Sequence, residues 1–362
     1  MDLPVNPPVM PMLANRVAEL PAGDQWIFEP KWDGFRTLVF RDGDELFIQS
    51  RDEKPLDRYF PELVGPLKEQ LPQRCVLDGE IVIAQDGGLD FESLQLRLHP
   101  AASRVKLLSG QIPASIVFFD VLCEGTRNLC KEPFRERRRV LEGILANAVK
   151  PLHVTPATRD RAVAEDWFRR FEGAGLDGVI AKSDAGTYEP NKRVMLKVKH
   201  ERECDCVVAG FRWHKNSEGT ALGSLLLGLF DDQGTLQHVG VCASFTAAKR
   251  KELVDFLAPY RENALEGHPW RNWADTQPPT EAALKRRPGE LSRWSQGKDL
   301  SWEPLRPELV VEVAYDHMQS GRFRHTAQFR RWRPDKRTTD CTFAQLEVVP
   351  PHEIEAIFGT GR

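Results

Sequence analysis

The amino-acid sequence predicts an α+β domain followed by a small all-β domain. Between residues 25 and 122, short apolar runs alternate with turn signals, and helical apolar patterns separate some of them. Because strands and helices do not alternate strictly, we expect an α+β domain rather than a doubly wound one. After Lys199 the apolar runs are all strand-like, and 362 residues give room for about two cores. We therefore expect domains at residues 1–200 and 201–362.

The first domain is expected to contain strands at the apolar runs of residues 26–28, 37–40, 46–48, 76–83 and 116–121. A hairpin turn is expected at residues 41–44, where Asp-Gly separates two of these runs. Helices are expected where apolar residues recur with the helical period, at residues 60–71, 91–98, 134–147 and 163–173, the last ending at a glycine.

The second domain shows strand-like runs at residues 206–210, 225–230, 236–241, 309–314 and 342–349, with one helical pattern at residues 249–257. This order fits a small Greek-key barrel of the OB type. A polar insert at about residues 261–307 contains Trp270, Trp273, Trp294 and Trp302. We expect a surface flap anchored by tryptophans, and the alternative is an element that contacts nucleic acid.

Residues 29–36, Glu-Pro-Lys-Trp-Asp-Gly-Phe-Arg, form the most informative segment. Lysine has a pKa of about 10.4 and becomes a useful nucleophile only when neighbours or burial release the free amine. Asp33-Gly34 would let the backbone turn tightly and bring a carboxylate near Lys31. Arg36 is always charged, and its fork shape suits a phosphate. Alone, the segment also fits a β-turn with solvated charges.

Further segments of the same kind follow in order along the chain. Residues 76–83 form an apolar run around Asp-Gly-Glu, and residues 115–122 form another that ends in Phe-Phe-Asp-Val-Leu. Residues 176–182 read Leu-Asp-Gly-Val-Ile-Ala-Lys, and residues 195–199 read Met-Leu-Lys-Val-Lys. Residues 331–336 read Arg-Trp-Arg-Pro-Asp-Lys.

This ordered set resembles motifs I, III, IIIa, IV, V and VI of the covalent nucleotidyltransferases, which include DNA ligases, RNA ligases and mRNA capping enzymes. The resemblance covers nearly the whole chain and is strongest to small bacterial ATP-dependent DNA ligases of the ligase C type. It implies an α+β nucleotidyltransferase (ATP-grasp-like adenylation) domain followed by an all-β OB-fold domain.

The resemblance also implies an activity. The enzyme would use ATP, form a lysyl-AMP intermediate and seal nicks between 5′-phosphate and 3′-hydroxyl ends of duplex DNA in repair, with Mg²⁺ or Mn²⁺. Its expected partners are nicked duplex DNA and separately encoded repair polymerase or end-binding proteins, and we expect a monomer.

The same resemblance assigns roles to the residues of motifs I and Ia. Lys31 would attack the α-phosphorus of ATP, and Glu29 matches the position that reads the adenine amino group. Asp33 would contact the ribose region, and Arg36 the ribose or phosphates. Arg51 follows an expected strand and matches an arginine that contacts the nucleotide and later the nick phosphate.

Two carboxylates, Glu80 and Asp177, are expected to hold the metal ion and the ribose hydroxyls, because Mg²⁺ prefers oxygen ligands. The family usually has glutamate where this chain has Asp177, so direct and water-mediated coordination both stay open. Phe119 matches the position that stacks on adenine, and Phe118 points to the other side of the strand, where a core residue is expected, but the sequence leaves open which of the two stacks.

The remaining expected site residues are cationic. Lys197 and Lys199 share one face of a strand, so both can aim at one phosphate. Lys182 ends a strand and either assists them or is solvated. In motif VI, Arg333, Asp335 and Lys336 are expected to reach the β- and γ-phosphates of ATP when the domains close.

Composition limits where such a protein acts. The net charge is −3, and Arg and Lys gather instead in clusters at residues 135–139, 192–202 and 322–337. The second and third overlap phosphate-handling motifs, so we expect a nucleic-acid surface there. Seven cysteines without framework spacing, a Pro-rich start without a signal pattern and no apolar run of 18 residues predict a cytoplasmic protein. The resemblance to DNA ligases implies in addition that it is nucleoid-associated.

Two alternatives stay open at this point. An RNA ligase or a GTP-using capping enzyme would share the motifs, although Glu29 favours adenine because an acceptor suits its exocyclic amine. A non-catalytic nucleic-acid binding module could keep the fold, but the intact Lys31, Glu80, Lys197 and Lys199 argue against it.

Overall fold

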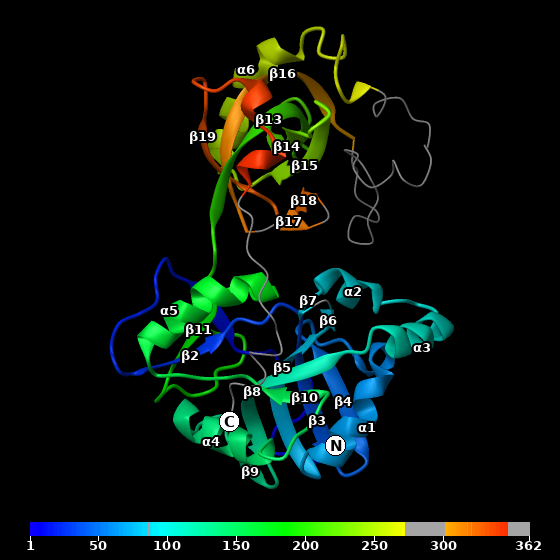
Figure 1. Cartoon of the computed structure of the whole chain (residues 1–362), viewed down its shortest axis with the longest axis vertical. Coiled ribbons are helices and arrows are strands. Elements are labelled where there is room, and N and C mark those ends of the chain that lie inside the picture. Colours follow the sequence, from blue (N-terminus) through cyan, green and yellow to red (C-terminus); the bar gives the residue numbers. More distant parts are fainter. Residues whose placement is uncertain (86, 272–300, 317, 320, 347–362) are drawn as a thin grey trace. The chain divides into compact units, whose positions relative to one another are not determined.

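The computed structural model describes residues 1–85, 87–271, 301–316, 318–319 and 321–346. The chain divides into two compact units, of which the first contains Met1–Lys199 and the second begins at His200. Figure 1 colours the first unit from blue to green and the second from green to red. Each unit has its own sheets and its own core.

Two sheets form the main framework of the first unit (Figure 1). The four-stranded sheet contains, in order, β1 (Leu13–Arg16), β12 (Arg193–Val198), β11 (Val179–Ser183) and β2 (Trp26–Pro30). The six-stranded sheet has the order β10 (Leu152–Val154), β8 (Ser115–Glu124), β5 (Arg74–Val82), β3 (Phe35–Asp42) and β4 (Glu45–Ser50), and β9 (Arg127–Asn128) pairs with β8. The short strands β6 (Ala84–Gln85) and β7 (Gly88–Leu89) pair with each other.

The helices of the first unit are α1 (Pro61–Gln70), α2 (Phe91–Leu96), α3 (Ala102–Gln111), α4 (Phe134–Ile144) and α5 (Arg161–Arg170), with 3₁₀ turns at Asp57–Tyr59 and Phe171–Ala174. Alternation along β3 divides its side chains between two cores. Val39 packs in one cluster with Leu63 of α1 and Leu141 of α4. Phe40 packs in another with Met195 of β12, so the second face of the six-stranded sheet meets the four-stranded sheet.

The expected strands of the first unit are present, and β3 and β4 form the expected hairpin, with Gly43 at φ 61°. Helix α3 was not expected, because only Val105 and Leu108 of its ten residues are buried and its apolar pattern is weak. The glycine after α5 that adopts the left-handed conformation is Gly175, at φ 82°, and a 3₁₀ turn separates it from the helix.

The second unit is a barrel built on one five-stranded sheet. Its strand order is β15 (Leu236–Cys242), β14 (Leu222–Phe230), β13 (Arg202–Trp213), β16 (Glu303–Tyr315) and β19 (Gln328–Trp332). Ala327, next to β19, donates its N–H to Val241 over 2.9 Å and forms a bridge with Cys242, so the two edge strands meet. Helix α6 (Ala247–Arg261) contributes Leu253 and Leu257 to the core. The strands β17 (Met318–Gln319) and β18 (Arg322–Phe323) form a separate hairpin.

The prediction of a fifth strand at residues 342–349 was wrong for the residues of this range that the structure describes. Phe343–Gln345 form a 3₁₀ turn, and residues 347–349 lie outside the described residues. The fifth strand is β19, which ends inside motif VI. Its segment reads Gln-Phe-Arg-Arg-Trp, and three polar residues in five hide the strand pattern, because only the two aromatics pack against the core.

The tryptophans expected on a surface flap do not share one role. Trp270 is fully buried in the barrel core and donates its indole N–H to the Leu236 carbonyl over 2.7 Å. Trp302 is half-buried and meets Trp270 edge-on at 6.0 Å, and β16 begins at the next residue. Trp273 and Trp294 lie outside the described residues. Among the helices that the structure describes, none combines the length and apolarity needed to cross a bilayer.

Candidate active site

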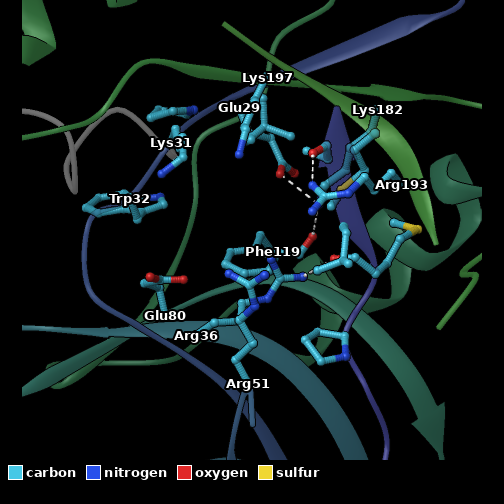
Figure 2. A pocket seen from close by; sticks show the side chains of 17 residues that line it. Glu29, Lys31, Trp32, Arg36, Arg51, Glu80, Phe119, Lys182, Arg193 and Lys197 are labelled. Atoms are coloured by element: carbon cyan, nitrogen blue, oxygen red, sulfur yellow. Dashed lines mark hydrogen bonds and ion pairs between the residues drawn. The ribbon is translucent and has the colours of Figure 1, made fainter. Parts of the chain in front are cut away.

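A cavity of about 200 Å³ lies in the first unit and contains most of the expected site residues (Figure 2). It is lined from both sheets, by β2 and β11 on one side and by β3, β5 and β8 on the other. The expected residues among its lining are Glu29, Lys31, Arg36, Arg51, Glu80, Phe119, Lys182 and Lys197. Of the others, Asp33, Asp177 and Lys199 are not among the lining residues, but the Asp177 carboxylate binds the ammonium groups of both Lys31 and Lys199. Motif VI lies in the second unit.

Backbone pairing fixes the position of Lys31 just after β2. The Lys31 N–H donates to the Gly178 carbonyl, and the Asp177 N–H donates to the Lys31 carbonyl, each over 2.9 Å. Gly178 has φ 126°, and a Cβ at this residue would stand 2.0 Å from the Val198 carbonyl oxygen. Only glycine therefore allows motif IV to run this close to motif V and still hold the lysine.

Gly34 of motif I has a different reason to be glycine. It was expected to permit a tight turn, but it is not among the residues with positive φ. A Cβ on Gly34 would stand 2.1 Å from the Ile81 carbonyl oxygen. The residue thus lets the chain pack directly against β5, and its N–H donates to Glu80 over 3.1 Å.

The ammonium groups of Lys31 and Lys199 share one oxygen of Asp177, at 2.7 and 3.0 Å. Burial lowers the pKa of Lys31, but the charge and hydrogen bond of Asp177 more than offset it, so this pKa is raised. Burial raises the pKa of Asp177, and the two lysines lower it below its ordinary value. The expected nucleophile is therefore held as a cation in this structure.

Lys197 behaves differently from its neighbours. Burial lowers its pKa, and the positive charges of Lys31 and Lys199 lower it further. A cation in this position is destabilised until an anion arrives, so Lys197 is suited to meet a phosphate.

A buried network holds Arg36 under the cavity. Its guanidinium makes two 2.6 Å hydrogen bonds to Asp78, whose carboxylate also accepts a 2.6 Å bond from the Tyr188 hydroxyl. The same guanidinium lies 4.5 Å from the centre of the Phe119 ring. Phe118 is fully buried in the neighbouring core, so Phe119 is the aromatic residue that reaches the cavity.

Glu80 faces the cavity from β5, directly opposite Arg36 of β3. Burial raises the pKa of Glu80 to about 7, and the charges of Arg36 and Lys31 offset only part of this. A carboxylate that is short of positive charge fits an added cation. Among the described residues, no three His, Cys, Asp or Glu side chains are grouped to hold a metal ion.

Glu29 is nearly fully buried and sits between two cations. Lys182 binds one of its oxygens at 2.8 Å, and Arg138 of α4 binds the other at 3.2 Å. Lys182 also donates to the Phe119 carbonyl over 2.8 Å. Arg138 donates to the Thr155 carbonyl over 2.7 Å, and the Thr155 hydroxyl accepts a 2.8 Å bond from the Trp32 indole. Arg138 therefore holds Glu29, which precedes Lys31, directly, and it holds Trp32, which follows Lys31, through Thr155.

Comparison with known proteins places this geometry in a family. The description "ATP dependent DNA ligase domain" matches residues 11–199, and "ATP dependent DNA ligase C terminal region" matches residues 218–336. DNA ligase C2 of Mycolicibacterium smegmatis is 56% identical over 97% of the chain and 98% of its own length. DNA ligase C of Mycobacterium tuberculosis is 54% identical over 96% of each chain.

The chain belongs to the ATP-dependent DNA ligases. This confirms the resemblance drawn from the motifs and decides against an RNA ligase, a capping enzyme or a non-catalytic binding module. A solved Lig E DNA ligase is 16% identical and covers 90% of the chain and 100% of its own, with a TM-score of 0.54. That likeness shows a shared fold for the nucleotidyltransferase and OB-fold units of the ligase.

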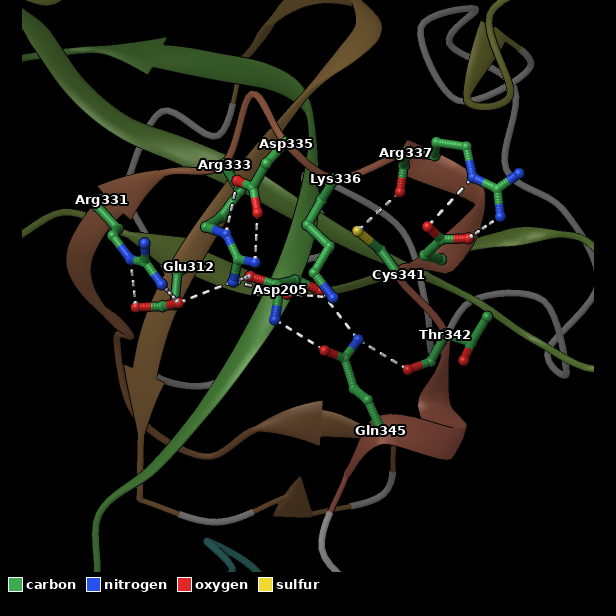
Figure 3. A network of polar contacts seen from close by, with 11 residues as sticks. Asp205, Glu312, Arg331, Arg333, Asp335, Lys336, Arg337, Cys341, Thr342 and Gln345 are labelled. Atoms are coloured by element: carbon green, nitrogen blue, oxygen red, sulfur yellow. Dashed lines mark hydrogen bonds and ion pairs between the residues drawn. The ribbon is translucent and has the colours of Figure 1, made fainter.

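Motif VI of the ligase lies at the end of β19 and in the turn that follows (Figure 3). Arg333 donates to Asp335 through two hydrogen bonds of 2.9 and 2.8 Å. It also donates to Asp205 and Glu312 over 3.0–3.2 Å. The expected phosphate ligand is thus already held by carboxylates, whereas Lys336 remains 3.8 Å from Asp205 and 41% exposed.

The basic cluster at residues 135–139 is not a uniform solvated face of the ligase. Arg137 is 1% exposed and forms a bidentate pair with the equally buried Asp120, and Arg138 is buried beside Glu29. Arg139, by contrast, is 73% exposed. Helical periodicity separates these neighbours, because successive residues on a helix point in different directions.

Several residues at the ligase site were not expected from the sequence. Asp78, Tyr188, Arg138 and Thr155 act through partners that are distant in sequence, and Arg193 and Trp32 line the cavity. One signal was available for Asp78, because motif III contains two carboxylates and an acid within an apolar run is costly without a partner.

Proposed function

We propose that Lys31 is the nucleophile of the ligase. Its Nζ would attack the α-phosphorus of ATP, form the P–N bond of lysyl-AMP and expel pyrophosphate as the bond to the β-phosphate breaks. The observation that carries this proposal is its fixed position: Lys31 lines the cavity, its ammonium is bound to the Asp177 carboxylate, and its backbone is held by two hydrogen bonds.

Lys31 must lose a proton before it attacks, and Asp177 opposes this loss in the structure described. Positive charge placed next to the Asp177 carboxylate would make the Lys31 proton easier to remove. We propose that Lys199 supplies part of this positive charge through its bond to the same carboxylate oxygen, and that Lys197 meets the α-phosphate.

We propose that Glu80 and Asp177 hold Mg²⁺ or Mn²⁺ together with phosphate oxygens of ATP. The raised pKa of Glu80 supports this, since burial leaves its carboxylate short of positive charge. When bound, the metal ion would neutralise charge on the phosphates and on these carboxylates.

Base and ribose recognition is proposed for residues around the same cavity. Phe119 offers its ring to adenine, and Glu29, held by Lys182 and Arg138, accepts from the exocyclic amine. Arg36 in the cavity lining and Asp33, the residue after the lining residue Trp32, would contact the ribose region, and Arg51 of the same lining would contact phosphate.

After self-adenylylation, a 5′-phosphate oxygen at a DNA nick would attack the same phosphorus and release Lys31. The 3′-hydroxyl would then attack the 5′-phosphorus and expel AMP. We propose that Lys336 contacts the departing pyrophosphate in the first step, because its ammonium is exposed and only loosely paired. We further propose a monomer that acts on nucleoid DNA in the cytoplasm, beside separately encoded repair proteins.

The test of the proposed nucleophile is labelling with radioactive ATP followed by a denaturing gel. Lys31→Ala should lose covalent AMP attachment, and Lys31→Arg should fail as well, because guanidinium keeps its proton. Lys192→Ala removes an exposed lysine paired with Glu189 and should label normally. A Lys31→Ala protein that still carries AMP would contradict the assignment.

A further inference from the structure

Two carboxylates face each other on neighbouring strands of the barrel. Asp205 of β13 and Glu312 of β16 are direct partners in the antiparallel ladder. They are only 14% and 15% exposed. Like charges that stand directly opposite each other in a sheet are destabilising, and poor solvation increases that cost. The pair therefore needs a cation between its members.

Arg333 is the cation that bridges this pair. Its Nη1 donates to both carboxylates over 3.0–3.2 Å, while Nε and Nη2 are bound to Asp335 (Figure 3). A guanidinium has five N–H donors, and these contacts use most of them. Its side chain is 13% exposed, against 63% for Arg331 and 41% for Lys336. Arg333 therefore has little left to offer an incoming phosphate.

The charges of this cluster balance when Arg333 is present. Asp205, Glu312 and Asp335 face the cations Arg331, Arg333 and Lys336. Without Arg333, Glu312 keeps its two hydrogen bonds from Arg331. Among the described residues, the Asp205 carboxylate would then keep the ammonium of Lys336 at 3.8 Å as its one cationic partner, so Lys336 would be drawn toward this poorly solvated carboxylate.

We infer that Arg333 is a positioning residue, which bridges Asp205 and Glu312 and so leaves Lys336 free to contact pyrophosphate. This rests on the proposed role of Lys336 in the first step. It differs from the expectation that Arg333 itself contacts the phosphates. Asp205 and Glu312 thereby become part of the machinery of self-adenylylation without touching ATP.

The decisive experiment combines Arg333→Ala with Asp205→Asn in the full-length ligase. Arg333→Ala alone should slow lysyl-AMP formation by about tenfold or more, as expected for coupled residues in one ion-pair network. Asp205→Asn in the same chain removes the charge that recaptures Lys336, so the double variant should regain most of the rate. Arg337→Ala is the matched control, since this neighbouring arginine is 82% exposed and paired only with Asp340 in the structure described.

The rate of joining an already adenylylated nick separates positioning from general support of the fold. No pyrophosphate leaves in that assay, so Arg333→Ala should join such nicks at a near-normal rate. If both assays fall equally, Arg333 is merely structural and the inference is wrong. If only the first step falls and Asp205→Asn does not restore it, Arg333 contacts the phosphates directly, and the inference is again wrong.

Failure of the proposed function would look different. If Lys336→Ala labels with AMP as fast as the unchanged ligase, the phosphate role of Lys336 is wrong, whatever Arg333 does. If Lys336→Ala is slow while Arg333→Ala is normal, the role of Lys336 stands and only the bridging role of Arg333 falls.

Discussion

The nucleotide cavity and motif VI hold their cations in contrasting ways. In the first unit, Lys182 and Arg36 are paired with carboxylates that are 2% and 0% exposed. In motif VI of the second unit, Arg331 and Asp335 are more than half exposed, whereas Arg333 is sheltered together with its partners Asp205 and Glu312. Buried pairs resist screening by salt, whereas exposed pairs contribute little and are screened.

This difference indicates a division of labour. Much of the cavity is organised before ATP arrives, because Lys31, Arg36 and Glu29 already have fixed partners of opposite charge. Motif VI keeps Lys336 and Arg331 at the surface, where they can exchange partners at small cost. Preorganised groups suit bond-making steps, and exchangeable groups suit contacts that are made and broken in each cycle.

The largest effect should come from Asp177, which connects both lysines of the cavity. Asp177→Ala should lower nick sealing by orders of magnitude, because Lys31 and Lys199 lose their shared partner and the proposed metal loses a ligand. Asp177→Glu restores the residue usual in the family and should retain activity. Multiple-turnover sealing of a nicked duplex measures both, and an inert glutamate variant beside an active alanine variant would remove Asp177 from the site.

The next largest effect should come from Asp78, and it tests the buried side of the comparison. Asp78→Asn leaves Arg36 and Tyr188 without their charged partner, and breaking such a pair should lower the free energy of unfolding by about 3 kcal/mol. Arg331→Ala breaks an exposed pair and should cost at most about 1 kcal/mol. Urea unfolding measures both, and equal losses would show that burial does not distinguish the two regions.

Arg138 should show a smaller effect on catalysis. Arg138→Ala removes a buried charged hydrogen bond to Glu29, worth about 1.5 kcal/mol, so the KM for ATP should rise about tenfold. Arg138→Lys should not restore it, because an ammonium cannot reach Glu29, Thr155 and Glu142 together. Arg139→Ala, from an exposed position on the same helix, is the control. An unchanged KM in Arg138→Ala would leave Glu29 without this support.

The smallest effect concerns His238 in the barrel core, against the edge of Trp270. Burial, followed by the charges of Arg322 and Arg212, lowers its pKa well below 6.5. Unfolded histidine takes up a proton below about pH 6.5 and the folded one does not, so stability falls as pH decreases, by at most about 1.4 kcal/mol per pH unit. His238→Gln should flatten this slope in thermal unfolding between pH 6.5 and 5. An unchanged slope would show that other titratable groups cause the pH dependence of stability in this range.

Local sequence patterns predicted best those site residues that lie on, or directly next to, the strands of the first unit. Lys31, Glu80 and Phe119 were expected from motifs on strands, and all three line the cavity. Period-two alternation placed Phe118 and Phe119 on opposite faces of their strand, but the choice between them stayed open until the structure showed Phe119 in the cavity lining and Phe118 fully buried.

What the sequence did not predict depends on pairing across long separations. Arg138 and Glu29 are 109 residues apart, and Tyr188 and Asp78 are 110 apart, so no local pattern links them. The strand β19 was missed because its charged side chains are paired with Glu312 of the adjacent strand β16 and Glu203 of the next strand β13, which only the folded barrel brings near.

The hydrogen-bond ladder between β2 and β11 restricts which insertions and deletions the sequence of this protein can tolerate. Val179 pairs with Pro30 and Ile180 with Glu29, and Lys31 follows at the end of the same ladder. A one-residue insertion within β2 would turn every following side chain to the opposite face. An insertion or deletion in this strand would therefore carry Lys31 and its neighbours out of the cavity, whereas a substitution that keeps the length of β2 leaves the ladder in register.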